Sequence, residues 1–516
     1  MKILHVTASY KPAYIYGGPI YSVAALCEEL CSGETEDGRL KTEDESRRLE
    51  DGGSRSEDRG RKLEDGGQKT EDGRQKTEDG GQKTEDGRQK TEDRKRATEG
   101  KEQKVEDEGR KIEKGNSKSA VGVTVYTTLA NGNEELPYQN GETKTVEGVK
   151  VKYFKRITKD HSHFSPSLLS HLWQNVRQFD VIHIHSWWNL VSMGGVLICL
   201  LKGIKPIVSP RGMLGNYTFN KTKLIFHKLI GQHLLKKCIF HATTKMEAEE
   251  IAVQVFGDKM YIIDLMWEGE KKQDTRCKIQ DTRDERTKIE SGKYKDSRGK
   301  KKEVRRKKKE ERGKKQEERE KIFVIHNIVK LPNMLPIKTR AFDGTLKLIF
   351  LSRIHHKKGI ELLLDTLSSI NFPFQLSIVG EGEIECVGSL KQKAKNLKID
   401  QYINWLGAVY GEEKYQLLAD HDAFILPSYN ENFANVVIEA IAVNTPVLLS
   451  EHVGLKDYVA ENNFGLVFKL DEIKLILEKI QSLLLANQSA FYFKKQMISD
   501  NLTLKYLEMY QSQLKH

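Results

Sequence analysis

The chain has 516 residues, of which 38% are hydrophobic and 31% charged, and its net charge is +11. The composition is uneven, because two charge-dense blocks, about 34–118 and 268–321, contain almost no aromatic residues and cannot bury a core. We interpret both as disordered insertions, and removing them leaves roughly 375 residues, enough for two domains. The segment 298–321 alone contains 14 Lys and Arg against 6 Asp and Glu. The positive charge therefore says little about the folded part, and we expect no nucleic-acid binding.

The six cysteines are scattered, with no C-x-x-C pair and no Cys/His spacing that suits zinc. This distribution fits a reduced cytosol and predicts no metal site. The first residues, MKILHVTASY, lack the features of a secretory signal. The longest nearly apolar run, Leu190–Leu201, is shorter than the about 20 residues that span a bilayer. We expect a cytoplasmic protein whose contact with the inner face of the cell membrane, if any, is peripheral.

The first half of the chain alternates strand-like apolar runs with helical patterns. The second charged block is flanked by two similar runs, KMYIID and KIFVIHN, and one interpretation is that one duplicates the other. The runs that we predict to be strands are 2–9, 122–128, 149–154, 180–186, 205–210 and 238–244.

The second half restarts the alternation, with a helix beginning near Lys358 and another over NVVIEAIA. Its predicted strands are 346–353, 374–380, 402–408, 422–428 and 445–450. Continuous apolar strands separated by helices indicate parallel sheets covered on both faces. The predicted fold class is α/β, with two doubly wound domains facing a cleft. We place the domains at residues 1–330 and 343–490 and expect a helical segment over 491–516.

Ligands of doubly wound sheets bind beyond the carboxyl ends of the strands, so the loops there are the first candidates. After the first strand, Gly17 and Gly18 directly precede a helix, whose first amides could receive a phosphate. The alternative is a glycine turn that permits close helix packing.

The segment PSYNENFANVVIEAIA places Glu431 after a strand and Glu439 in a helical pattern eight positions later. A helix over all eight residues would rise about 12 Å and turn about 80° beyond two full turns, so both carboxylates could lie along one site. One could then hold a ribose and the other a sugar. Phe433, Ala434 and Asn435 lead into the helix, whose amino end suits an anion. The alternative is a capping carboxylate and a solvated helix residue.

Arg353 and Lys358 stand on either side of a turn after the first strand of the second half. A leaving diphosphate gains charge as a glycosidic bond breaks, and these cations could stabilise it. As surface cations near a helix start they would be disfavoured by the helix dipole.

The motifs taken together resemble retaining glycosyltransferases of family 4, which have the GT-B fold of two Rossmann-like domains. The resemblance spans nearly all of the non-inserted chain. It rests on the Gly17-Gly18 loop and on HIHSWW, SPRGML, SRIHHKKG, IVGEGE and the E-x7-E segment.

The resemblance implies that Glu439 binds the ribose and Glu431 the transferred sugar. It also implies that Arg353 and Lys358 bind the diphosphate and that His185 lies near the reacting carbon. Gly17 and Gly18 would lie against the phosphates or the acceptor, and Gly380 of IVGEGE belongs to the donor site.

Two of these residues have structural alternatives. His183 and His185 share one strand face, and a strand histidine is often a hydrogen-bonded core residue. Arg211 of SPRGML could bind a phosphate or carboxylate of the acceptor, or it could stabilise its loop. The chain also departs from the family at Ala434 and Asn444, where glycine is common, and a positive φ would make the first change serious.

The expected reaction is transfer of a sugar from a nucleoside-diphosphate sugar to a saccharide or lipid-linked acceptor, with retention and without an obligatory metal, in cell-envelope or polysaccharide biosynthesis. The rival interpretations are a GT-B sugar epimerase or phosphorylase, and a non-catalytic interaction module. The segment 219–238 combines five lysines with an apolar stripe. That segment predicts either membrane contact or packing on its own domain.

Overall fold

The fold is taken from a computed structural model. It describes residues 1–14, 17–32, 121–257, 262–264, 322–337, 341–486 and 502–514. All of these residues belong to one compact unit. The two predicted insertions lie outside the described residues.

The first of the two large sheets among the described residues has the strand order β10-β11-β9-β8-β7-β1-β2-β6-β5. Its strand pairs are parallel except for β5 with β6. The strands are β1 (Lys2–Val6), β2 (Gly122–Thr128), β5 (Thr143–Val146), β6 (Val149–Phe154), β7 (Val181–His185), β8 (Ile207–Ser209), β9 (Ile239–Ala242), β10 (Ile262–Asp264) and β11 (Ile322–Val324).

The second sheet has the order β14-β13-β12-β15-β16-β17, with parallel pairs throughout. Two separate sheets of alternating β and α elements confirm the predicted fold class. The strands are β12 (Leu346–Leu351), β13 (Phe374–Val379), β14 (Ile403–Gly407), β15 (Ala423–Leu426), β16 (Val447–Ser450) and β17 (Gly465–Phe468). A short hairpin of β3 (Ala130–Asn131) and β4 (Glu134–Glu135) stands apart.

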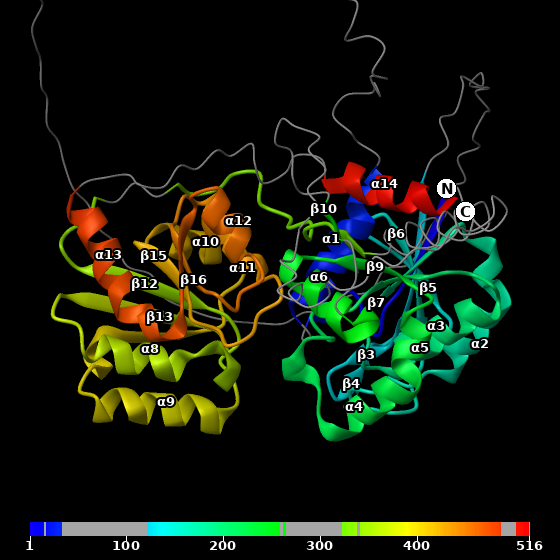
Figure 1. Cartoon of the computed structure of the whole chain (residues 1–516), viewed down its shortest axis with the longest axis horizontal. Helices are drawn as coiled ribbons and strands as arrows, with labels where there is room; N and C mark the ends of the chain where they lie inside the picture. Colours follow the sequence, from blue (N-terminus) through cyan, green and yellow to red (C-terminus); the bar gives the residue numbers. More distant parts are fainter. Residues whose placement is uncertain are drawn as a thin grey trace, which may run out of the picture. The chain divides into compact units, whose positions relative to one another are not determined.

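Helices connect each pair of successive strands of the second sheet and several pairs of the first, such as β6 with β7 and β7 with β8 (Figure 1). The C-terminal helix α14 (Leu502–Leu514) joins the core of the first sheet, where it packs beside α1. The helices are α1 (Gly18–Ser32), α2 (Pro166–Asn175), α3 (Leu190–Leu201), α4 (Lys221–Phe226), α5 (Gln232–Leu235), α6 (Lys245–Ile251), α8 (Ile360–Leu367), α9 (Ile384–Asn396), α10 (Gly411–Ala419), α11 (Asn435–Ala442), α12 (Lys456–Glu461) and α13 (Ile473–Leu485).

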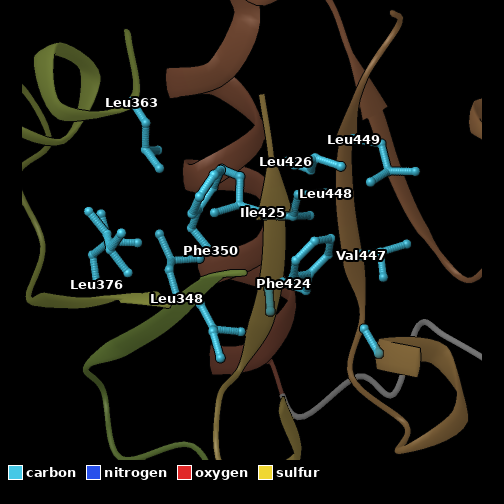
Figure 2. Packing of buried hydrophobic residues seen from close by; sticks show 14 of the residues in the cluster. Leu348, Phe350, Leu363, Leu376, Phe424, Ile425, Leu426, Val447, Leu448 and Leu449 are labelled. Carbon is cyan, nitrogen blue, oxygen red and sulfur yellow. The ribbon is translucent and has the colours of Figure 1, made fainter. Parts of the chain in front are cut away.

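The core of the second sheet shows why its strands read as continuous apolar runs. Every residue of β15 and of β16 is buried. Figure 2 shows Phe424 and Leu426 on one side of β15 and Ile425 on the other, and the register of β15 with β16 places Leu448 on the side of Ile425. A strand buried on both faces needs apolar residues at every position, so the alternation of a half-exposed strand is absent here.

Both flanks of the second charged block form strands. β10 lies at the edge of the first sheet and pairs with β11, whereas β11 lies between β10 and β9. The interpretation that one run duplicates the other stays open, but both runs are accommodated because parallel strands of similar sequence add side by side.

Candidate functional site

Three basic side chains follow β12 where the chain turns into α8. Lys358 is buried and its ammonium donates to the Glu431 carboxylate. Arg353 is exposed. Burial lowers the pKa of Lys357; Glu431 opposes that shift, and the charges of Lys358 and Arg353 reinforce it. The cations exceed what the Glu431 carboxylate neutralises, so this turn can accept an anion.

Glycines bring the loops of this region into close contact. Gly359 has φ +71°, and a Cβ there would lie 2.1 Å from the Pro427 carbonyl oxygen. Gly380 has φ +138°, and a Cβ there would lie 1.9 Å from the Ser352 carbonyl oxygen. Both positions therefore require glycine to hold neighbouring strand ends together. The donor contact predicted for Gly380 stays a prediction.

The backbone of Glu431 is fixed on both sides. Its amide donates to the His452 carbonyl at 3.0 Å, and its own carbonyl accepts from the Gly454 amide at 2.8 Å. The next residue, Asn432, donates from its side-chain amide to Thr243 Oγ1 at 2.9 Å. These bonds hold the Glu431 carboxylate at the end of β15, beside Lys358.

The rise and turn calculated for the two carboxylates assumed one helix from Glu431 to Glu439, but helix α11 begins after Glu431. It starts at Asn435, and Ala434 before it has the left-handed conformation, with φ +59°. Glu431 therefore precedes the helix, so the helical geometry assumed over all eight residues is wrong. Phe433 is buried, with its ring 5.5 Å from the ring of His326.

Glu439 has a partner that sequence reasoning missed. Its carboxylate lies 2.8 Å from the Lys414 ammonium of α10, and both side chains are mostly buried. A ribose bound by Glu439 would have to share the carboxylate with Lys414 or displace the Lys414 ammonium from it. The two carboxylates, Glu431 and Glu439, thus each face a lysine in this state.

The ends of the first sheet's central strands hold a cluster of buried polar side chains. The residues lie on adjacent parallel strands, where His5 pairs in register with His183, and His185 with Ser209. All are fully buried, as is His241 of β9. Tyr510 of α14 is also buried against them. The two-residue spacing links only His183 and His185, and the topology brings the other positions to them.

The first half of this network has one consistent proton arrangement. The Ile325 carbonyl can only accept, so His241 donates to it from Nε2 at 2.9 Å. Burial and the Arg211 charge lower the pKa of His241 to about 3, so this ring is neutral and Nδ1 accepts from Ser209 at 2.6 Å. Ser209 then accepts from His183 Nε2 at 2.6 Å. His183 Nδ1 in turn accepts from the Tyr510 hydroxyl at 2.8 Å.

The second half ends at His5. An Arg211 nitrogen lies 3.3 Å from His185 Nδ1 and can only donate, so His185 carries its proton on Nε2. That proton is donated to His5 Nδ1 at 2.9 Å. Burial and the Arg211 charge lower the pKa of His5 to about 3. His5 is therefore neutral with its proton on Nε2, which has no hydrogen-bond partner among the described residues.

The cluster of His5, His183 and His185 also has the composition of a metal site, with one ring nitrogen of each within 4.8 Å of the others. A cation on His185 Nε2 would require a proton on Nδ1, which would then face the donors of Arg211. Both nitrogens of His183 are already hydrogen-bonded. The residues therefore fit a hydrogen-bond network better than a metal centre.

The remaining predicted residues lie near this network. His185 is fully buried with both ring nitrogens engaged, so its contact with a sugar stays a prediction. Arg211 donates to Ser22 at 2.8 Å and to Asn327 at 2.9 Å, which favours its structural interpretation, although acceptor binding is untested. A Cβ added at Gly17 or Gly18 would meet none of the described residues' atoms within 4 Å, so these residues leave room for a ligand to approach.

Comparisons with known proteins show which proteins this chain is similar to. Residues 335–499 match the family model of the glycosyl transferases group 1. An uncharacterized glycosyltransferase of Methanocaldococcus jannaschii is 29% identical over 126 residues, or 24% of this chain and 32% of its own length. A Campylobacter jejuni N-acetylgalactosaminyltransferase, which acts on a diphospho-undecaprenol saccharide, is 25% identical over 170 residues, or 32% of this chain and 45% of its own length. The matches thus span between about a third and half of these relatives.

The fold is also similar to that of a solved structure. Anabaena HepE in complex with UDP and glucose superposes with a TM-score of 0.54 at 12% identity, covering 99% of this chain and 100% of that chain. This likeness confirms the predicted GT-B arrangement of two Rossmann-like domains.

Replacing Ala434 by glycine should stabilise the protein. A left-handed conformation costs an L-residue about 1–2 kcal/mol, and glycine avoids this cost. Glycine also makes the unfolded chain more flexible, which lowers the free energy of unfolding by about 0.4–1 kcal/mol. We expect the free energy of unfolding to rise by about 0.5–1 kcal/mol, measured by denaturant titration. The matched control is Asn444→Gly, at φ +61°, where little change is expected because asparagine tolerates this conformation. An Ala434→Gly variant no more stable than the wild type would contradict the claim that the backbone conformation of Ala434 is strained.

The buried histidines should make stability depend on pH. Because the folded pKa of His241 is about 3, the unfolded state binds a proton near pH 6.5 that the folded state does not. The free energy of unfolding should therefore fall as the pH drops below 6.5, by about 1.4 kcal/mol per such histidine between pH 7.5 and 5.5. Urea titrations of the wild type and of His241→Gln should differ by this amount in their pH dependence. His233→Gln, at an exposed histidine, is the matched control substitution.

Proposed function

We propose that this chain is a retaining glycosyltransferase, because residues 335–499 match the family model of the glycosyl transferases group 1 and the fold is of the GT-B type. It would move a sugar from a nucleoside-diphosphate sugar to an acceptor hydroxyl. The observation that carries the proposal is the Lys358–Glu431 pair, set among Lys357 and Arg353. A nucleotide sugar supplies both groups that such a site would bind, a diphosphate and a polyhydroxylated ring.

The proposed chemistry assigns the cations to the leaving group. The bond between the anomeric carbon and the diphosphate oxygen breaks, a bond from that carbon to the acceptor oxygen forms, and the acceptor hydroxyl loses its proton. Negative charge grows on the diphosphate as its bond breaks, so Arg353, Lys357 and Lys358 would stabilise the transition state more than the bound substrate. Glu431 would accept from sugar hydroxyls with the oxygen that Lys358 leaves free, and Glu439 from the ribose.

The comparisons guide the choice of substrates. The complex of HepE with UDP and glucose supports testing UDP-sugars first. The diphospho-undecaprenol saccharide of the Campylobacter relative supports a lipid-linked saccharide acceptor, in envelope or polysaccharide biosynthesis. Formation of a glycosylated acceptor would separate this function from a GT-B epimerase or phosphorylase, and any turnover would exclude a purely non-catalytic module.

A second surface supports contact with a membrane. The segment from α4 to α5, with a π-helical turn over His227–Gly231 between them, buries His227, Gly231 and Leu235. Its opposite side exposes Leu224, Ile225, Leu229 and Ile230, of which Ile225 and Leu229 are 60% and 70% exposed. The apolar stripe noted in the sequence is therefore only partly used for packing on the domain.

The charges around these apolar side chains favour an anionic membrane. Residues 219–238 contain five lysines and no acidic residue, and Lys221 and Lys228 are exposed next to the apolar group. Lysine stems can lie along an apolar surface while their ammonium groups reach lipid phosphates. The described helices include none long and apolar enough to cross a bilayer. We propose that this surface docks peripherally, which would bring the enzyme to a lipid-linked acceptor.

Removing the proposed cations should abolish transfer. Because loss of one preorganised electrostatic stabiliser costs about 10²–10³ in turnover, we expect at least that loss for Arg353→Ala and for Lys358→Met. The measurement is sugar transfer from a panel of UDP- and GDP-sugars, with folding checked by circular dichroism. Lys393→Met is the control, since Lys393 pairs with Asp365 at 2.7 Å on the same domain. Wild-type transfer by folded Arg353→Ala/Lys358→Ala protein would refute the assignment.

Membrane binding should depend on the charge and apolar surface of α4 and the π-helical turn. Each lysine near an anionic surface contributes about 1 kcal/mol, so Lys221→Gln/Lys228→Gln should weaken partitioning about 30-fold. Co-sedimentation with phosphatidylglycerol-containing vesicles measures it, and vesicles of phosphatidylcholine alone should bind less. Ile225→Gln should also weaken binding, whereas Leu475→Gln, at a residue 61% exposed on α13, should not. Equal binding by the wild type and the lysine variant would remove the proposal.

A further inference from the structure

Two exposed tyrosines stand beside the Gly17-Gly18 turn. Tyr14 and Tyr21 are each 43% exposed. Their rings stack with centroids 5.4 Å apart and planes inclined by 23°. Stacked aromatic rings are usually covered by other side chains, because ring surface left in water loses the stabilisation that burial would give. An exposed stack at a strand end is therefore a candidate surface for a ligand with an apolar face.

The loop that carries Tyr14 is held by several bonds. The Tyr14 amide donates to the Pro12 carbonyl at 2.8 Å, and the Gly17 amide donates to the Tyr14 carbonyl at 2.9 Å. Lys11 nearby is mostly buried and lies 2.6 Å from a Glu28 carboxylate oxygen of α1. Tyr21 belongs to α1 itself. Both rings thus stand on anchored backbone, and a ligand that stacks on them would pay little ordering entropy.

The position of the stack relates it to the proposed reaction. The loop follows β1, the strand that pairs with β7 and its terminal His185. The pKa of Tyr21 is raised by burial first and then by Tyr14, Tyr410 and Glu439, while Lys11 opposes the shift. Glu439, the carboxylate that we assign to the ribose of the donor, is thus among the charges that act on Tyr21.

We propose that Tyr14 and Tyr21 form a stacking platform for a pyranose ring of the acceptor. This inference rests on the proposed glycosyl transfer. One face of many pyranoses presents C–H groups, which pack against the electron-rich face of an aromatic ring, and the phenol hydroxyls can bond to sugar hydroxyls at the ring edge. The cations proposed to bind the diphosphate lie on loops of the second sheet, so we assign the platform on the first sheet to the acceptor.

The test measures acceptor binding with and without turnover. The probes are octyl glucoside, octyl galactoside and octyl N-acetylglucosaminide, titrated below their micelle concentrations by calorimetry into wild type, Tyr14→Ala and Tyr21→Ala. Each alanine variant should weaken glycoside binding, and raise the acceptor KM, about 3- to 10-fold, as expected for an aromatic contact of about 0.5–1.5 kcal/mol. Tyr14→Phe and Tyr21→Phe should keep most of the affinity, because they keep the ring. Tyr402→Ala is the matched control, at a tyrosine that is also 43% exposed.

The outcomes separate the platform from the proposed function. Glycoside binding lost in the alanine variants of a protein that transfers no sugar would support the platform and overturn the transferase. Glycoside affinity and acceptor KM unchanged in folded Tyr14→Ala and Tyr21→Ala would overturn the platform, whatever the turnover. A rise in the donor KM alone would also overturn it, because the rings would then stack on the nucleobase. Wild-type protein that binds none of the three glycosides would refute it as well.

Discussion

The ion pair between Lys358 and Glu431 is the interaction on which the candidate site depends. It joins the loops after β12 and β15, which are neighbours in the second sheet. One carboxylate, Glu431, then stands near three cations, Lys358, Lys357 and Arg353, so positive charge is in excess there. A nearly buried ion pair adds little net stability, because desolvation offsets most of the attraction. Its value to the protein is therefore better explained by binding. The pair holds an acceptor of hydrogen bonds near the cations Lys357 and Arg353, which is the combination that the proposed binding of a sugar attached to a diphosphate would need.

Much of the fold could be predicted because buried parallel strands need apolar residues at nearly every position, and this pattern is visible in the sequence. Strands such as β15 and β16 are apolar at every position since both faces are covered, and the strand ends then indicate where to look for ligands. The helix over NVVIEAIA could be predicted from its apolar pattern and is α11, but the left-handed conformation of Ala434 before it could not, because the alanine side chain disfavours it. The partner of Glu439 was also missed, since Lys414 lies on a different helix and nothing in the spacing links the two.

The histidine network was missed for a different reason. His5, His241 and Tyr510 are far apart in the chain, and they meet only because the strand order places β1, β7, β8 and β9 side by side and α14 returns to the first sheet. The flank after the second charged block contributes as well. Ile325 and Asn327, which directly follow β11, accept bonds from His241 and Arg211. β11, rather than β10 at the sheet edge, is thus the strand that leads into the site.

The charge of Arg211 and the neutrality of the histidines depend on each other. Arg211 is a donor in a buried setting, and its charge lowers the pKa of His5 and of His241 in addition to the effect of burial. Burial and the neighbouring charges of His183 and Arg211 also hold the pKa of His185 well below its usual range. His185 cannot take up a proton at neutral pH without placing a second positive charge beside the guanidinium. The structure therefore holds His185 as a neutral ring whose two nitrogens are hydrogen-bonded to His5 and to Arg211.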